Sequence, residues 1–466
     1  MGCSSIIDYL FILFNYKNLK SKLIERPKMN HLNNTSKFYL FKLSVPIFFA
    51  NIAVPMVGLV DTGLMGHLSS EKFLAAISIA TSVVGMVLWS FGFLRMGTVG
   101  LISQSLGKND WNEICLIFIR NFIIALLLGI LIMLLKNPIL LLTEHYFKTS
   151  QETQLLINKY ISIRLLSAPA ELTLYVLVGL FLGLQKTKIA SLGISIFCIG
   201  NIILSSIFVI HFNLEIIGAA IGTVISAYVT VIIFLLFSFF LLKNKFNIKL
   251  TSTRIFNAKK MLQLFNINFD IFIRTIFLTF SFLWVTYQSA KLGENYLAVN
   301  TILMQFIMLA SFFLDAYAFS TEAVIGYTIG KKSDKSFLQV VKNSFQLSII
   351  SGLIISFLYL ISFKVIVNQL TDLDYLRYLA FNYFIWVVVI PPVASLCYQF
   401  DGIFIGASQT AEMRNGMVIS VIIFITSSHF LVNNFGNHGL WLALLFFMIM
   451  RSITLNYYFK NILKRF

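Results

Sequence analysis

The sequence predicts an all-α integral membrane protein of about 12 transmembrane helices, arranged as two pseudo-symmetric six-helix bundles. Three observations predict this fold: an apolar composition, a regular succession of long apolar segments, and a repeat between the two halves of the chain. Hydrophobic residues make up 58% of the 466 residues and charged residues only 12%, whereas soluble domains carry about 25% charged residues. This composition excludes a soluble enzyme, a disordered protein and a disulfide-stabilised scaffold.

The apolar segments follow one another steadily from Phe38 onward, and each is long enough for a helix to cross a bilayer. The expected spans are residues 38–62, 73–104, 114–135, 156–183, 189–210, 216–242, 261–290, 296–328, 337–362, 376–406, 415–432 and 439–459. No stretch shows the period-two alternation of apolar and polar residues that a membrane β-barrel requires. Proline removes a helix hydrogen bond, so we expect kinks at Pro46, Pro55, Pro169, Pro391 and Pro392.

The spans divide the chain into an N-lobe of residues 38–242 and a C-lobe of residues 261–466. Residues 243–260 form a basic cytoplasmic linker between the lobes, and residues 1–37 form a cytoplasmic N-terminal extension. Met29 is an alternative start of the chain, in which case residues 1–28 are not translated.

The distribution of Lys and Arg predicts the orientation in the membrane. With both termini cytoplasmic, 23 of these residues fall on the cytoplasmic side and five on the outer side, as the positive-inside rule requires. We therefore expect a multi-pass protein of the plasma membrane, which is the inner membrane in a bacterium. The same distribution accounts for the net charge of +17 without a nucleic-acid partner.

Similar motifs recur in the two halves at an offset of 223 residues. Leu74-Ala75-Ala76 resembles Leu297-Ala298-Val299, and Gly107-Lys108 matches Gly330-Lys331. The same offset relates Pro169 to Pro392, Gly179 to Gly402, Gly183 to Gly406 and Thr187 to Thr410. Six spans in each half keep the halves parallel, so we expect two repeats related by an axis along the membrane normal. This architecture predicts a central cavity that opens alternately to each side.

Asp61 is the leading functional candidate, because a charged residue inside an apolar span is costly. Its equivalent at the 223-residue offset is Trp284, so only the N-lobe carries this carboxylate. Burial disfavours the charged form of a carboxyl group, so Asp61 could take up a proton from outside and release it inside. The structural alternative is an Asp that caps its helix or is solvated.

Three polar residues of the N-lobe are expected near Asp61. Asn201 and Ser205 lie four residues apart on the fifth span and therefore face the same way. Together with Thr223 on the next span, they could hydrogen-bond Asp61 or bind its ion. Each is also explained by an ordinary interhelical hydrogen bond.

The C-lobe carries a second group of polar residues. Asp315 and Glu322 are seven residues apart on one face of the eighth span, and Asn300 lies near its start. Arg274 follows Asp270 by four residues in the seventh span, and pairing with Asp270, Asp315 or Glu322 would make a buried ion pair. Alternatively, these acids give the cavity a negative face for cationic cargo. Two further intramembrane charges have no partner that the sequence assigns: Arg95 and Asp401.

The sequence contains no pattern typical of catalysis, a cofactor or a metal. The four cysteines, Cys3, Cys115, Cys198 and Cys397, form no C-x-x-C pair, and the six histidines form no H-E-x-x-H cluster. An intramembrane enzyme would need a convergent nucleophile or histidine group. His429 and His438 have no evident partner, so a transporter is favoured over an enzyme, and also over a permanent pore.

Short motifs in order along most of the chain resemble one known family. In the first half they are Ser44-Val45-Pro46, Val54-Pro55-Met56-Val57-Gly58-Leu59-Val60-Asp61-Thr62, Gly66-His67-Leu68, Phe93-Leu94-Arg95-Met96, Ser167-Ala168-Pro169 and Gly200-Asn201-Ile202. In the second half they are Ala298-Val299-Asn300, Leu314-Asp315-Ala316-Tyr317-Ala318, Glu322-Ala323, Asp401-Gly402-Ile403-Phe404-Ile405-Gly406-Ala407, Glu412-Met413-Arg414-Asn415 and Gly436-Asn437-His438-Gly439-Leu440-Trp441. From about residue 38, the chain resembles the multidrug and toxic compound extrusion (MATE) family, in its DinF-like branch.

The resemblance implies a cation-coupled exporter of amphipathic, often positively charged organic compounds, with two lobes that rock between outward-open and inward-open states. Asp61 falls on the family's coupling aspartate, and Asn201 and Thr223 on its neighbours. The family often has a second aspartate where this chain has Ser205, so the resemblance favours H⁺ over Na⁺, which needs several oxygen ligands.

A same-class alternative is a flippase for lipid-linked saccharides, for which we would expect a more basic cavity. The partners implied are small organic substrates and the lipid bilayer, with no nucleic acid, and the expected functional unit is a monomer.

Overall fold

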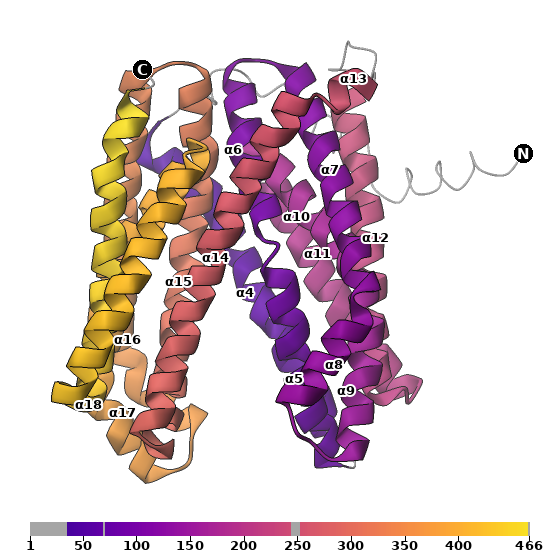
Figure 1. The fold of residues 1–466 in the computed structure, drawn as a ribbon, viewed down its shortest axis with the longest axis vertical. Helices are drawn as coiled ribbons and strands as arrows, with labels where there is room; N and C mark the ends of the chain where they lie inside the picture. Colours follow the sequence, from indigo (N-terminus) through magenta and orange to yellow (C-terminus); the bar gives the residue numbers. More distant parts are fainter. Residues whose placement is uncertain (1–34, 69, 244–251, 465–466) are drawn as a thin grey trace, which may run out of the picture.

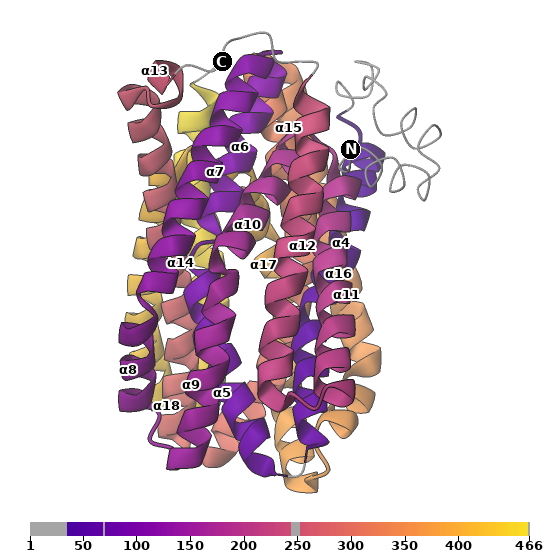
Figure 2. The ribbon, with the colours of Figure 1, turned by 90° about the vertical axis from the view of Figure 1, so that its right-hand side faces the viewer.

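The protein consists of long helices in two bundles that stand side by side (Figure 1). The computed structural model describes residues 35–68, 70–243 and 252–464, and all regular secondary structure in these segments is helical. Figure 2 shows that most helices run along the long axis of the molecule. The expected extension, up to residue 34, and residues 244–251 of the expected linker lie outside the described residues, so the proposed domain boundaries remain predictions.

The first bundle, the N-lobe, comes from the first half of the chain. Its elements are α4 (Lys37–Gly66), α5 (Glu71–Trp89), α6 (Phe93–Gly107), α7 (Trp111–Leu134), α8 (Lys136–Tyr146), α9 (Gln151–Arg164), the 3-10 turn η1 (Leu165–Ser167), α10 (Ala168–Gly183), α11 (Thr187–Ser206), the π-helical turn η2 (Ile207–His211) and α12 (Glu215–Lys243). The second bundle, the C-lobe, follows the short helix α13 (Ser252–Ile255). Its elements are α14 (Ala258–Leu292), α15 (Glu294–Gly330), α16 (Asp334–Leu370), α17 (Asp374–Gly406) and α18 (Thr410–Leu463).

Eleven helical segments within the described residues are long and apolar enough to cross a membrane. The last, α18, is 54 residues long and contains one non-helical residue, Gly436, with φ 55° and ψ −133°. At the 223-residue offset Gly436 corresponds to Asn213, which has φ 51° in the connection between η2 and α12. The helix α18 is therefore two spans joined at Gly436, and each lobe has six spans, as the sequence predicts. The chain is a multi-pass membrane protein.

The backbone confirms the repeat at the predicted offset. Two turns with positive φ occur at equivalent positions, Asn109 with Lys332 and Gln185 with Ser408. Close helix contacts repeat as well: a side chain at Gly129 would collide with the backbone of Pro169, and one at Gly352 with the backbone of the equivalent Pro392. Likewise, Gly179 lies against the Arg95 carbonyl and Gly402 against the equivalent Ala318 carbonyl.

Helix boundaries follow local chemistry. Side chains of Ser36, Asp110 and Asn257 cap the starts of α4, α7 and α14 by accepting hydrogen bonds from backbone N–H groups.

The expected second span, 73–104, is divided at residues 90–92 into α5 and α6.

The expected proline kinks have two outcomes. Pro169 is the second residue of α10, directly after η1, so it lies at a break in the fourth span. The helices α4 and α17 continue through Pro46 and Pro55, and through Pro391 and Pro392, respectively, without a change of helix type.

The two lobes meet at the end of the molecule that carries α13 and the C-terminus, which we call the linker end. There Gly107 packs directly on Gly330: a side chain at Gly107 would overlap the Tyr327 carbonyl, and one at Gly330 would overlap the Gln104 carbonyl. These contacts are equivalent at the 223-residue offset, so the axis that relates the lobes passes between the two glycines. Toward the opposite, far end the lobes diverge (Figure 1).

Candidate functional site

The N-lobe contains a cavity of about 330 Å³ enclosed mainly by α4, α5, α9, α10, α11 and α12. Asp61 of α4 lies in its wall and is only 3% exposed. Its Oδ1 atom has no hydrogen-bond partner among the described residues, while Ser205 lies within hydrogen-bonding reach of the carboxyl group and the Arg164 guanidinium lies nearby. Asp61 is therefore a buried acid that faces a cavity and retains an unused oxygen.

The expected neighbours of Asp61 come together on α11 and α12. Asn201 Nδ2 donates a hydrogen bond of 2.5 Å to Thr223 Oγ1, and Thr223 also lines the cavity. Ser205 Oγ and Thr223 Oγ1 both donate to the Ala219 carbonyl, at 3.3 and 3.1 Å. The Asn201 Oδ1 atom is buried without a partner among the described residues. The structure thus brings together the four residues expected to form the ion site, and their role in coupling remains a prediction.

The sequence analysis missed a second charged group in this cavity. Arg164 donates hydrogen bonds to Glu171 and Ser167, and Ser167 Oγ donates to Glu171 at 2.7 Å. Tyr160, which is 1% exposed, lines the cavity beside them. Arg164 and Glu171 are seven residues apart, the spacing that singled out Asp315 and Glu322, so the same rule applied to the fourth span would have found them.

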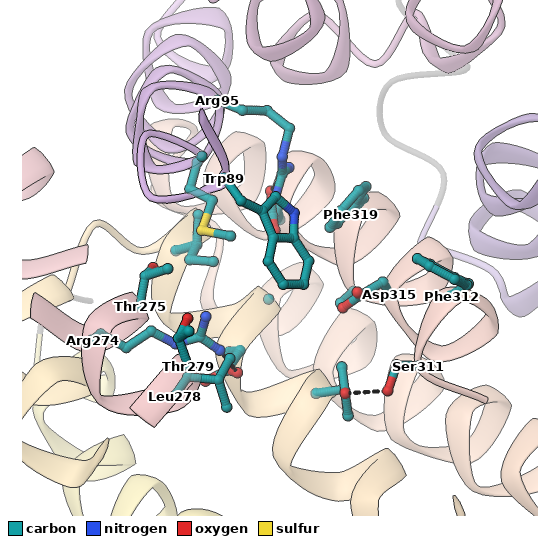
Figure 3. Close-up of a pocket in the computed structure, with 18 of the residues that line it drawn as sticks. Trp89, Arg95, Arg274, Thr275, Leu278, Thr279, Ser311, Phe312, Asp315 and Phe319 are labelled. Atoms are coloured by element: carbon teal, nitrogen blue, oxygen red, sulfur yellow. Dashed lines mark hydrogen bonds and ion pairs between the residues drawn. The ribbon is translucent and has the colours of Figure 1, made fainter. Parts of the chain in front are cut away.

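A second pocket, of about 240 Å³, lies between the lobes (Figure 3). It is enclosed by α5, α6 and α10 of the N-lobe and by α14, α15, α17 and α18 of the C-lobe. Six charged side chains line it: Arg95, Arg274, Asp315, Glu322, Asp401 and Arg451. Aromatic side chains make up much of the remaining wall: Trp89, Tyr175, Phe282, Phe312, Phe319 and Tyr398. We call this the central pocket.

The ion pairs of the central pocket differ from those expected. Arg274 pairs with Asp401, whose Oδ2 atom also accepts a 2.6 Å bond from Arg451. The expected partners of Arg274, namely Asp270, Asp315 and Glu322, are therefore wrong.

Asp270 lies one turn away from Arg274 on α14, toward the linker end, and its carboxylate faces the start of α18. There it accepts hydrogen bonds from Thr410, at 2.9 Å, and from Arg414. Glu322 pairs with Arg95, at 3.0 Å.

The pair of Arg95 and Glu322 joins the two lobes, since Arg95 belongs to α6 and Glu322 to α15. Both side chains are buried, at 8% and 1% exposure, and the guanidinium lies 3.7 Å from the centre of the Phe319 ring. Arg95 and Tyr175 line both the central pocket and the N-lobe cavity. These two residues are therefore where the two spaces meet.

Asp315 differs from the other acids of the central pocket. It has no hydrogen bond or ion pair with any of the described residues. Arg95 and Arg274 are nevertheless close enough to interact with it electrostatically. In Figure 3 its carboxyl group lies beside Phe312 and Phe319, while Arg274 extends from another helix. Asp315 is therefore the acid that a ligand could contact without breaking an ion pair.

Asn300, which was expected in the same charge network, lies apart from these charges. Its amide bonds Ser289 and Asn437, both at 2.7 Å, and its carbonyl oxygen accepts from Trp441 at 2.9 Å. It holds α14, α15 and α18 together and lines a neighbouring pocket. Acids and arginines are equal in number in the central pocket, so its wall is mixed in charge rather than uniformly negative.

Comparison with known proteins identifies the family. The family model described as MatE matches residues 46–208 and 271–433, one segment in each lobe. The chain is 34% identical over 418 residues to the DNA damage-inducible protein F of Escherichia coli, covering 89% of this chain and 90% of that protein. It is 24% identical over 261 residues to the multidrug export protein MepA of Staphylococcus aureus, covering 55% and 56% of the two chains.

A solved structure supports the same assignment at the level of the fold. It is described as the outward-facing conformation of a multidrug resistance MATE family transporter of the MOP superfamily. It superimposes with a TM-score of 0.83 at 17% identity, over 94% of this chain and 98% of that one. With the two equivalent lobes, the MatE match in both halves and the relationship to the Escherichia coli protein, the chain belongs to the MATE family of membrane transporters.

Proposed function

We propose that this protein is a proton-coupled exporter of amphipathic organic compounds that carry a positive charge. It would work as an antiporter, by alternating access between the two lobes. The observation that carries the proposal is the asymmetry of the lobes: Asp61, buried and with a free oxygen, faces the N-lobe cavity, whereas the equivalent Trp284 donates a hydrogen bond to Ser428 at 2.8 Å. If the two lobes were chemically identical, neither could bind the ion differently from the other, and ion binding could not be coupled to one step of the transport cycle.

The surroundings of Asp61 favour H⁺ over Na⁺. A proton needs one carboxyl group, whereas a sodium ion needs several oxygen ligands. Ser205 lies next to Asp61 and offers one neutral hydroxyl oxygen, whereas a second carboxylate at this place would add charged oxygen ligands. Arg164 is paired with Glu171, which leaves Asp61 as a single carboxyl group without an ion pair among the described residues, and a single carboxyl group is enough to carry a proton.

The proposed orientation puts the linker end and both termini in the cytoplasm of a bacterial cell, with the protein in the inner membrane. In that orientation the state described here is closed toward the cytoplasm, because Gly107 packs on Gly330 and Arg95 pairs with Glu322 at the linker-end side. Transport to the other side would require these contacts to separate. A single chain contains both lobes, so we propose that the monomer is the functional unit.

The test is transport by the purified protein in liposomes with an imposed ΔpH or an imposed ΔNa⁺ and a fluorescent cation as substrate. The proposal predicts accumulation driven by ΔpH in the wild type, at least tenfold less in Asp61→Asn, and no drive from ΔNa⁺ alone. Asp110→Asn, at the exposed start of α7, is the matched control and should transport like the wild type. ΔpH-driven accumulation by Asp61→Asn at the wild-type rate would rule out Asp61 as the coupling group.

A further inference from the structure

The charges of the central pocket form two poles of opposite sign. At one pole two buried guanidinium groups, of Arg274 and Arg451, share the single carboxylate of Asp401, so this cluster carries a formal charge of +1. At the other pole stands Asp315, which has no ion-pair partner among the described residues and carries −1 when ionised. The pair of Arg95 and Glu322 is neutral. With Asp315 ionised, the pocket as a whole is balanced but dipolar.

A ligand that enters a buried pocket of this kind changes its charge balance. A simple cation placed against Asp315 would leave the excess charge of the Arg274–Arg451–Asp401 cluster without a counter-ion in a low-dielectric space, which is costly. A zwitterion keeps the balance, because its cation pairs with Asp315 and its anion with the two arginines. Guanidinium groups are also the side chains best suited to bind a carboxylate.

The shape and wall of the pocket indicate the rest of the ligand. Phe312, Phe319 and Tyr398 provide aromatic surface for a planar ring system. A neighbouring pocket of about 300 Å³ shares Trp89, Thr279, Phe282 and Met308 with the central pocket, and none of the described residues lining it is charged. Together the two spaces reach the size of a typical site for a drug-sized molecule.

We propose that the central pocket recognises an amphipathic zwitterion: a planar aromatic compound whose cationic group faces Asp315 and whose carboxylate faces Arg274 and Arg451. This inference rests on the proposed function, since it takes the pocket between the lobes to be the substrate site. It adds a requirement for an acidic group on the substrate, which export of simple cations does not have.

The test compares two dyes that differ only at the carboxyl group, rhodamine 110, a free acid and zwitterion, and its methyl ester rhodamine 123, a cation. Their binding to the purified full chain in nanodiscs at neutral pH is measured by fluorescence polarisation. The acid is expected to bind about tenfold more tightly, the ratio that one charge-assisted hydrogen bond supplies. In Arg274→Gln, where Arg451 alone neutralises Asp401, this ratio should fall to about one. Equal or tighter binding of the ester by the wild type overturns the proposal.

A second variant, Asp315→Asn, controls for misfolding of Arg274→Gln. It breaks no ion pair with a described residue and should therefore fold like the wild type. It should weaken rhodamine 123 about tenfold and strengthen binding of the anion fluorescein, because the pocket then carries a net positive charge. Weakening of all three dyes by the same factor contradicts the dipolar site. Equilibrium binding needs no gradient, so Asp61→Asn should keep the ratio of acid to ester. Failure of coupling in liposomes with this ratio intact would refute only the proposed function.

Discussion

The two lobes share a backbone plan but differ in where they hold charge. In the N-lobe the charged group lies inside the lobe, around Asp61, Arg164 and Glu171, and lines that lobe's own cavity. At the equivalent positions the C-lobe has Trp284, Val387 and Ala394, which cannot ionise. Its own acids and arginines line the pocket between the lobes instead. The two copies of the repeat thus share a backbone but not their charges. On the proposed function, the N-lobe cavity binds the ion and the pocket between the lobes binds the substrate.

The polar clusters also differ in how completely they are paired. Asp401 is held by two arginines and Glu322 by one. Asp61 has no ion pair among the described residues and lies beside a cavity. An ion-paired acid stabilises one arrangement of helices, whereas we expect an acid without an ion pair to exchange its proton more readily. We therefore expect mutations of the paired acids to act on stability or conformation, and mutation of Asp61 to act on coupling.

The largest effect on stability is expected at Asp401. Asp401→Asn leaves Arg274 and Arg451 buried without a carboxylate, and removal of one partner from a buried ionic cluster typically costs about 3–5 kcal/mol. The thermal midpoint of the detergent-solubilised protein should fall clearly. The matched control is Asp372→Asn, an exposed acid paired with Arg377, which should cost less than about 1 kcal/mol. Equal shifts for the two variants would mean that the central cluster does not stabilise the C-lobe.

An intermediate effect is expected at the contact between the lobes. Glu322→Gln removes the counter-ion of Arg95 and should favour separation of the lobes at the linker end. Spin labels at Lys72→Cys and Lys291→Cys, at the far ends of α5 and α14, would report this as a population with a shorter distance, in a background without the native cysteines. Glu294→Gln, at the start of α15, is the control and should leave the distance distribution unchanged. An unchanged distance distribution in Glu322→Gln would show that the pair of Arg95 and Glu322 does not stabilise the contact of the lobes at the linker end.

The smallest effect is expected at Trp284, the C-lobe equivalent of Asp61. Trp284→Phe keeps an aromatic ring but removes the hydrogen bond to Ser428, which is worth about 1 kcal/mol. Transport driven by ΔpH should stay within about twofold of the wild type, as measured in liposomes beside Asp61→Asn. A loss as large as that of Asp61→Asn would mean that both positions serve coupling, and the division of tasks between the lobes would be wrong.

Most of the fold could be predicted from the sequence, because each span is a long apolar segment and one offset relates the halves. Even the break at Gly436, which joins two spans into α18, agrees with two separately predicted spans. The break at residues 90–92 was not predicted, since apolar residues predominate on both sides of it and no proline marks it.

The sites were predictable only in part. The sequence could indicate Asp61, Ser205 and Thr223, because each is a polar residue in an otherwise apolar span. The partner of Arg274 could not be found this way, because it depends on the rotation of α14 relative to α17 and α18. Spacing along one helix favoured Asp270, four residues away, but that carboxylate faces Arg414 instead. Arg164 and Glu171 could have been found, since they show the same seven-residue spacing as Asp315 and Glu322.

The N-lobe cavity and the central pocket share Arg95 and Tyr175 in their walls. On the proposed function, we expect a substrate in the central pocket to alter the proton affinity of Asp61. The most direct test is the number of protons released when substrate binds to the purified protein, followed with a pH indicator in weak buffer. The account predicts release of about one proton per chain by the wild type and by Asp315→Asn at saturating ligand, and none by Asp61→Asn, although that variant still binds the ligand. Full proton release by Asp61→Asn would contradict the claim that this carboxyl group couples the ion to the substrate.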